Sequence, residues 1–203
     1  MLSLSVHEWA HAWTAHKLGD DTARNLGRLT LNPMSHIDPM GTIILPALLV
    51  FSGSGFFFGW AQPVPISPTR FSRHVRMKTG VVLTAAAGPI SNLVLALLMG
   101  LMLKFIPMID MQGSPVETLV FLMFQINIIL AVFNLIPVPP LDGNRVVVGL
   151  LPDKAEQSYY RFMEQYSFIV PLAFMALILF GGEVIQWPLN MLSEFLLTIT
   201  GNR

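Results

Sequence analysis

The sequence predicts an all-α polytopic membrane protein, a single domain over residues 1–203 with about four to six transmembrane helices. Two observations indicate this class. Hydrophobic residues make up 53% of the chain and charged residues 12%, whereas an ordinary soluble domain carries roughly 25% charged residues. The charges are also separated by long uncharged runs, and about 20 apolar residues are enough to cross the hydrocarbon core of a bilayer.

Charge and cysteine content narrow the functions that remain. The formal net charge is zero, so no excess of basic residues is available to neutralise a nucleic-acid backbone, and we expect no nucleic-acid partner. Cysteine is absent, so a tightly bound metal ion would need His, Asp or Glu ligands. The expected surroundings of the chain are those of an integral, multi-pass protein in a lipid bilayer.

Residues 1–18 are predicted to form a short helix that contains polar groups. They lack the basic start and the small-residue cleavage site of a signal peptide, and His7, Glu8 and His11 interrupt the apolar stretch. Only six residues precede His7, which is too few to complete a span. We therefore expect that an upstream piece is missing or that the chain begins partway into the bilayer.

Residues 19–66 are predicted to form a loop that includes an apolar stretch, which either re-enters the membrane or crosses it. Residues 41–58 are apolar but contain Pro46 and a Ser-Gly run, and basic residues flank both ends of the stretch. Because basic loops prefer the cytoplasmic side of a membrane, the pattern favours a re-entrant hairpin, with a full crossing as the alternative.

Two stretches, residues 28–31 and 59–66, are expected to be extended and to form a short β-hairpin or edge strand after the first helix. Pro63 and Pro65 cannot donate backbone hydrogen bonds, which confines the second stretch to a sheet edge or an irregular strand. An unpaired edge close to an active site could accept a substrate in extended form.

The remaining helices are predicted from the uncharged runs. They cover residues 79–106, 115–137, 162–182 and 184–200. The last of them carries Pro188 and Glu194, so its pattern is weaker. We favour a final span there over a helix lying at the membrane interface.

The pattern HEWAH at residues 7–11 predicts a metal site. Residues four apart lie on one face of an α-helix, so His7 and His11 can direct their imidazole nitrogens to one ion. Glu8 lies beside the first ligand, where its carboxylate can take a proton from a water molecule at the metal without coordinating the metal itself. The alternative is a set of polar residues paired within a helix interface, which is costly in an apolar helix.

Catalytic zinc usually takes three protein ligands, so a third ligand must come from elsewhere in the chain. The candidates include His16, His36, Asp38, His74 and Asp110 as well as Asp142. Asp142 is favoured because it ends a long uncharged run and follows three prolines, whose broken backbone indicates a polar cavity. An Asp-Gly turn or a helix cap is its alternative explanation. His16, His36 and Asp38 are expected to be solvated interface residues, or else to line a water opening.

Three motifs, in this order, resemble those of the site-2 proteases, membrane-embedded zinc metalloproteases that perform regulated intramembrane proteolysis. The pattern HEWAH at 7–11 resembles the family's metal helix, AGPISN at 87–92 its intervening Gly-x-x-x-Asn helix, and residues 134–143 its second motif, whose aspartate is the third ligand. The segments 27–33 and 59–66 further resemble compact bacterial and archaeal members without a PDZ domain.

The resemblance implies one Zn²⁺ per chain, a prokaryotic cell membrane and a membrane-spanning protein substrate whose helix must unwind before cleavage. It also implies contacts to the substrate or transition state from four residues, which are Asn134, Gly88, Asn92 and Gln62. Asn134 would donate a hydrogen bond to the scissile carbonyl. Gly88 has a simpler explanation as a site of close helix packing, and Asn134 as a cap for backbone groups freed by Pro137.

The sequence therefore predicts an intramembrane zinc endopeptidase. One alternative is an inactive relative that binds membrane helices, which Glu8 argues against because binding alone would not need it. A metal or ion transporter is the other, and it would place ionisable residues across successive spans, which the runs 79–103 and 165–182 lack. The substrate's identity and the oligomeric state do not follow from the sequence.

Overall fold

The structure, a computed structural model, describes residues 1–53 and 59–202, and all regular elements within these ranges are helical. The helices are α1 (Leu2–Lys17), α2 (Thr22–Asn25), α3 (Leu45–Phe51), α4 (Met77–Phe105), α5 (Pro115–Asn134), α6 (Asp142–Leu150), α7 (Asp153–Gln165), α8 (Ile169–Phe180) and α9 (Gly182–Thr200). Short 3-10 or π-helical turns are η1 (Pro33–His36), η2 (Pro39–Ile44), η3 (Pro68–Arg70) and η4 (Pro107–Ile109).

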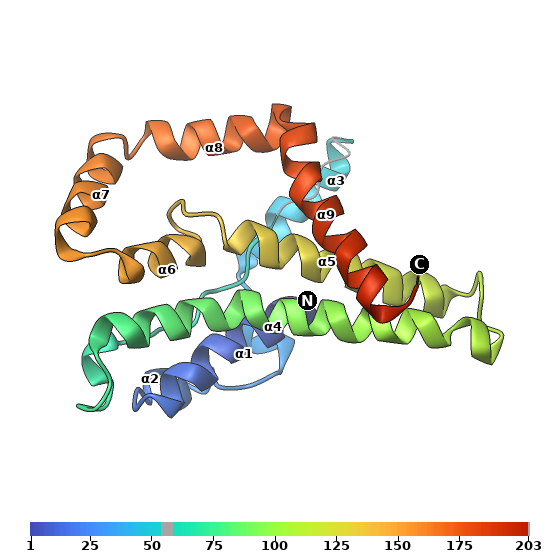
Figure 1. The fold of residues 1–203 in the computed structure, drawn as a ribbon, viewed down its shortest axis with the longest axis horizontal. Coiled ribbons are helices and arrows are strands. Elements are labelled where there is room, and N and C mark those ends of the chain that lie inside the picture. The colour runs from blue at the N-terminus through green and yellow to red at the C-terminus, as the bar shows by residue number, and fades with distance from the viewer. Residues whose placement is uncertain (54–58, 203) are drawn as a thin grey trace.

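Helix α4 is the central element of the fold. It packs against α1, α5 and α6, and Figure 1 shows α5 running along it while α1 crosses on its other side. The apolar core between α4, α5 and α9 is formed by Ala96, Phe124, Ile128 and Leu196. Among the described helices, α4 and α5 are the two that are long and apolar enough to cross a bilayer.

The predicted helices agree with the structure except at their ends and in one break. Helix α5 ends at Asn134 rather than at residue 137, as expected for a helix followed closely by Pro137. The predicted helix 162–182 is two helices, α7 and α8, separated at residues 166–168. The start of α7 was missed because Asp153 and Glu156 lie outside the uncharged run. In the structure both contact the ammonium group of Lys78 on α4.

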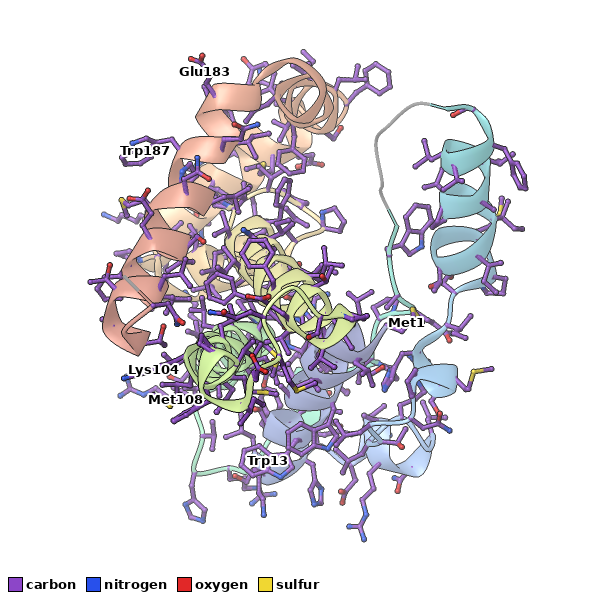
Figure 2. The ribbon with its side chains drawn as sticks, turned by 90° about the vertical axis from the view of Figure 1, so that its right-hand side faces the viewer. Met1, Trp13, Lys104, Met108, Glu183 and Trp187 are labelled. Carbon is purple, nitrogen blue, oxygen red and sulfur yellow. The ribbon has the colours of Figure 1, made fainter. Side chains whose placement is uncertain are left out.

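The start of the apolar stretch 41–58 lies beside Trp60, which follows the stretch by two residues. The N–H of Trp60 donates to the carbonyl of Gly41 at 3.2 Å, and the Thr42 hydroxyl donates to the carbonyl of Trp60 at 2.7 Å. Between these ends, η2 leads directly into α3, which stands apart from the α4, α5 and α9 bundle in Figure 2. Residues 54–58 of the stretch lie outside the described residues. A chain whose ends meet in this way has the geometry that a re-entrant hairpin requires.

The expected β-hairpin or edge strand is wrong for the described residues. Residues 59–66 contain no strand, because their backbone donors bind partners other than a strand. The N–H of Gln62 donates to the carbonyl of His36 at 2.9 Å, and the N–H of Val64 donates to the Glu8 carboxylate at 2.8 Å. Pro63 and Pro65 have no N–H to add. We call residues 59–66 the extended segment.

A buried carboxylate holds the far end of the extended segment to α1. Asp20 follows α1 and is fully buried, and its Oδ2 accepts from the N–H of Ser67 at 2.6 Å. Its Oδ1 accepts from the N–H and the hydroxyl of Thr22. Burial raises the pKa of the Asp20 carboxyl, but the hydrogen bonds from Thr22 and Ser67 outweigh burial and bring this pKa below its ordinary value.

The lowered pKa of Asp20 predicts a specific loss of stability in acid. Its ionised form stabilises the fold fully above the unfolded-state pKa of about 3.9, and this contribution is lost as the pH falls through the lower, folded-state pKa. We expect Asp20→Asn to cost about 1–3 kcal/mol at neutral pH and to remove part of the wild-type dependence below about pH 4. Denaturant unfolding against pH measures both effects. The exposed Asp110, changed to Asn, is the control, and an unaltered acid limb in Asp20→Asn would refute the assignment.

Candidate metal centre

Three predicted ligands converge between α1 and the start of α6. His7 and His11 lie one turn apart on α1 and are buried, with 4% and 6% of their surfaces exposed. Their Nε2 atoms lie 3.1 Å from each other, and each lies 3.1 Å from Oδ2 of Asp142. Although 131 residues or more separate Asp142 from the histidines along the chain, the three donor atoms form a nearly equilateral triangle.

The donor set fits a zinc ion. Tetrahedral zinc with ligand bonds of about 2.0–2.1 Å places neighbouring donors about 3.3 Å apart, and the observed separations are 3.1 Å. Two neutral imidazoles and one carboxylate are also ligands that zinc accepts in proteins. None of the other candidate ligands lies in such a converging group within the part of the chain that the structure describes.

Gly88 on α4 lies directly against the two histidine rings. A Cβ atom at Gly88 would lie 2.4 Å from His11 Nε2 and 2.6 Å from His7 Cε1. No real Cβ makes such contacts, so α1 and α4 can approach this closely only because residue 88 has no side chain. This geometry favours the packing explanation of Gly88 over the expected contact with substrate.

The second ring nitrogen of each histidine is also fixed. His7 Nδ1 lies 2.6 Å from Oδ1 of Asn92, and His11 Nδ1 lies 2.7 Å from the carbonyl oxygen of Thr84. Both partners are acceptors, so both Nδ1 atoms carry the proton and both Nε2 atoms offer a lone pair to the metal. Asn92 was expected to contact substrate or transition state, whereas its amide here contacts the first metal ligand.

The start of α6 holds Asp142 in position. A Cβ atom at the neighbouring Gly143 would lie 2.2 Å from the carbonyl oxygen of Leu135, so the Asp-Gly pair packs tightly on the end of α5. Asp142 is buried, and its Oδ2 lies 3.1 Å from both Nε2 atoms. The carboxylate is therefore placed to share a cation with the two imidazoles.

The Glu8 carboxylate is held by the extended segment. Its Oε2 accepts the N–H of Val64 at 2.8 Å, and Val64 is buried with Ala12 of α1. Pro63 and Pro65 flank Val64 and lack an N–H, so Val64 is the only residue of this tripeptide that can hold the carboxylate. This role of the backbone at Val64 was not found from the sequence, where both prolines were noted only as strand breakers.

The other predicted residues lie outside the ligand triangle. The amide of Asn134 donates to the carbonyl of Leu130 at 3.0 Å, and the side chain of Gln62 is exposed.

His16 pairs with Asp21. The carboxylate of Asp38 accepts the N–H of Gly41 and so caps the start of η2. His36 is fully buried, and its Nε2 binds the carbonyl oxygen of Thr30. The expected solvated position of His36 is therefore wrong.

Comparison with known proteins identifies the class. The model of peptidase family M50 matches residues 106–178. The “Putative zinc metalloprotease YwhC” of Bacillus subtilis (strain 168) is 38% identical over 194 residues, which cover 93% of this chain and 82% of that protein. No solved structure matches the chain.

More distant relatives are proteins named “Putative zinc metalloprotease Rip2”. Those of Mycolicibacterium smegmatis and Mycobacterium tuberculosis (strain H37Rv) are 36% and 35% identical over 145 residues. The match covers 70% of this chain and 52% of each relative, so the chain spans about half the length of these two proteins.

A membrane-associated metalloprotease is thus the class that these observations define. The chain belongs to peptidase family M50, the site-2 protease family. Membership agrees with the two apolar helices α4 and α5, which mark the chain as a membrane protein.

Substitution of Gly88 tests the contact between α4 and the histidines. We expect Gly88→Ala to displace both imidazoles, to cost about 1–3 kcal/mol of stability and to abolish stoichiometric metal binding. Metal analysis and thermal unfolding of the purified protein measure these effects. Gly100→Ala on the same helix is the control, because its Cβ would meet Thr200, at 3.1 Å, and Phe124, at 3.5 Å, and neither histidine. Full metal occupancy in Gly88→Ala would contradict the prediction.

Proposed function

We propose that this chain is an intramembrane zinc endopeptidase that cleaves transmembrane-helix substrates, with one Zn²⁺ per chain held by His7, His11 and Asp142. The observation that carries the proposal is the triangle of donor atoms, 3.1 Å on each edge, next to Glu8 in the motif HExxH. The helices that supply the triangle, α1 and α6, pack on α4, one of the two helices able to cross a bilayer. A substrate within the membrane is therefore within reach of the site.

Glu8 is the proposed general base. A bound zinc ion would supply Lewis acidity, which lowers the pKa of a coordinated water and polarises the scissile carbonyl. The N–H of Val64 holds one oxygen of the Glu8 carboxylate, and the other oxygen takes the proton of the attacking water and later returns it to the leaving amine. His7 and His11 keep their Nε2 atoms unprotonated through their Nδ1 hydrogen bonds.

The extended segment is the proposed docking edge for an unwound substrate. Its backbone at 60, 62 and 64 is bound to the rest of the protein, so residues 61, 63 and 65 face the other way in an extended chain. With proline at 63 and 65, that outer edge is mainly an acceptor of substrate N–H groups. Gln62, exposed on this segment, is a proposed substrate contact, whereas Asn134 would first have to release the carbonyl of Leu130.

The proposed topology is multi-pass, in a prokaryotic cell membrane. Helices α4 and α5 cross the bilayer, and residues 41–58 enter it as a re-entrant hairpin, which the hydrogen bonds of Gly41 and Thr42 with Trp60 support. Helices α1, α8 and α9 complete the four to six membrane segments that the composition predicts. The bacterial origin of the similar proteins supports the choice of membrane.

The variant Glu8→Gln separates catalysis from metal binding. Glutamine keeps a carbonyl oxygen for the N–H of Val64 but cannot act as a base, so we expect zinc content to stay near one per chain. Cleavage of a membrane-spanning substrate should fall by about 10²–10⁴-fold. Zinc analysis and gel-based cleavage in proteoliposomes measure this, with Glu164→Gln on the exposed face of α7 as the control. Retained activity would refute the role of Glu8, and a wild type without cleavage would favour an inactive helix-binding relative.

The variant Asp142→Ala tests the third ligand. Two histidines alone leave the ion with too few protein donors, so we expect the purified variant to lose its zinc as well as its activity. Asp153→Ala, eleven residues along the chain, is the control and should retain both. Full zinc occupancy in Asp142→Ala would place the third ligand elsewhere and exclude the triangle as the site.

A further inference from the structure

We propose that Asn127 on α5 is a positioning residue of the metal centre, which acts through Asn92 to fix the imidazole of His7. The proposal rests on the metal site described above and adds a residue outside its motifs. Asn127 lies seven residues before the Asn134–Gly143 motif, in the middle of a long uncharged run. It makes no contact with the three proposed ligands in the hydrogen bonds that the structure gives for it.

Asn127 is fully buried in a helix that is otherwise apolar at its core. A buried amide without hydrogen bonds would cost about 1–3 kcal/mol by mutational measures, so its partners matter. Its Nδ2 donates to the carbonyl of Met123 at 2.8 Å and to the hydroxyl of Ser3 at 3.0 Å. Its Oδ1 accepts from Nδ2 of Asn92 at 2.8 Å. Every polar atom of this side chain is therefore used.

The backbone carbonyls of Met123 and Ser3 decide which way the side-chain amides of Asn127 and Asn92 are turned. A carbonyl oxygen can only accept, so the carbonyl of Met123 requires the NH₂ group of Asn127 and turns Oδ1 of Asn127 toward Asn92. Asn92 then has to present its own NH₂ group, which also donates to the carbonyl of Ser3 at 3.2 Å. The oxygen of Asn92 is left facing Nδ1 of His7, 2.6 Å away.

This direction decides which nitrogen of His7 is free for the metal. Because Oδ1 of Asn92 only accepts, Nδ1 of His7 carries the proton and Nε2 keeps its lone pair. A turned amide at Asn92 would offer N–H to Nδ1 and favour the other tautomer, with the proton on Nε2. Of the two donor contacts that prevent this turn, the one to Asn127 is shorter than the one to Ser3, 2.8 Å against 3.2 Å.

The two histidines differ in how they are held. His11 binds a backbone carbonyl, that of Thr84 in α4, which the helix keeps fixed. His7 binds a side-chain amide, which can rotate unless other groups hold it. The orientation of His7 therefore depends on α5 through Asn127, although α5 supplies no ligand to the site.

Zinc affinity of single and double variants tests the proposal. Chelator competition with purified protein in detergent should show that Asn127→Leu, similar in size but without hydrogen bonds, binds zinc about 10-fold more weakly, as for other supporting groups of metal ligands. Asn92→Ala should weaken zinc binding at least as much. If Asn127 acts through Asn92, the double variant should bind zinc as Asn92→Ala does, without a further loss.

Two controls separate positioning from packing. Ile128→Val, at the neighbouring fully buried position, should lower the melting temperature of the zinc-free protein but leave zinc affinity unchanged. Ser3→Ala should change the affinity less than about 3-fold, because the carbonyls of Met123 and Ser3 remain to set the amides. Unchanged affinity in Asn127→Leu, or losses that add in the double variant, would overturn the proposal. Zinc retained by Asp142→Ala would instead refute the underlying metal site.

Discussion

The close approach of α1 to α4 at Gly88 is the contact on which the metal centre depends. Both histidine rings lie against this glycine, at distances that no Cβ atom would permit. The same approach brings the carbonyl of Thr84 and the amide of Asn92 to the two Nδ1 atoms. A single missing side chain thus allows one helix to supply the ligands and its neighbour to fix their tautomers.

The second constraint is that polar groups inside an apolar bundle need partners. The centre meets this requirement with a continuous series of hydrogen bonds, from the carbonyl of Met123 through Asn127 and Asn92 to His7. Most of the remaining surface of α4 and α5 is apolar and exposed, as suits helices surrounded by lipid. The buried polar side chains of the bundle described here, Asn127 and Asn92, therefore lie next to the proposed metal centre.

The extended segment is tied to α1 and to the residues just after it. Glu8 of α1 holds the N–H of Val64, and Asp20, just after α1, holds the N–H of Ser67. Movement of this segment would therefore move the carboxylate proposed as the base. A substrate strand docking on its outer edge would meet a catalytic group already bound to the inner edge, which links substrate placement to proton transfer.

The sequence by itself determined the local chemistry of this protein. Helical periodicity placed His7 and His11 on one face, with Glu8 beside them, and the uncharged runs placed α4 and α5. Asp142 followed from a charge and three prolines at the end of such a run. These inferences depend on neighbours within a few residues of each other, and the structure brings His7, His11 and Asp142 together. For residues 59–66, the local pattern wrongly gave strand partners.

Only the tertiary structure decided which distant groups meet. The contacts of Gly88 and Asn92 with the histidine rings did not follow from the sequence, and neither did the bond of Asn127 to Asn92. The reason is physical: a hydrogen bond between α4 and α5, or between Glu8 and the backbone of Val64, joins residues 35 or 56 positions apart. Local periodicity carries no information about such pairs, which are fixed by how closely the helices pack.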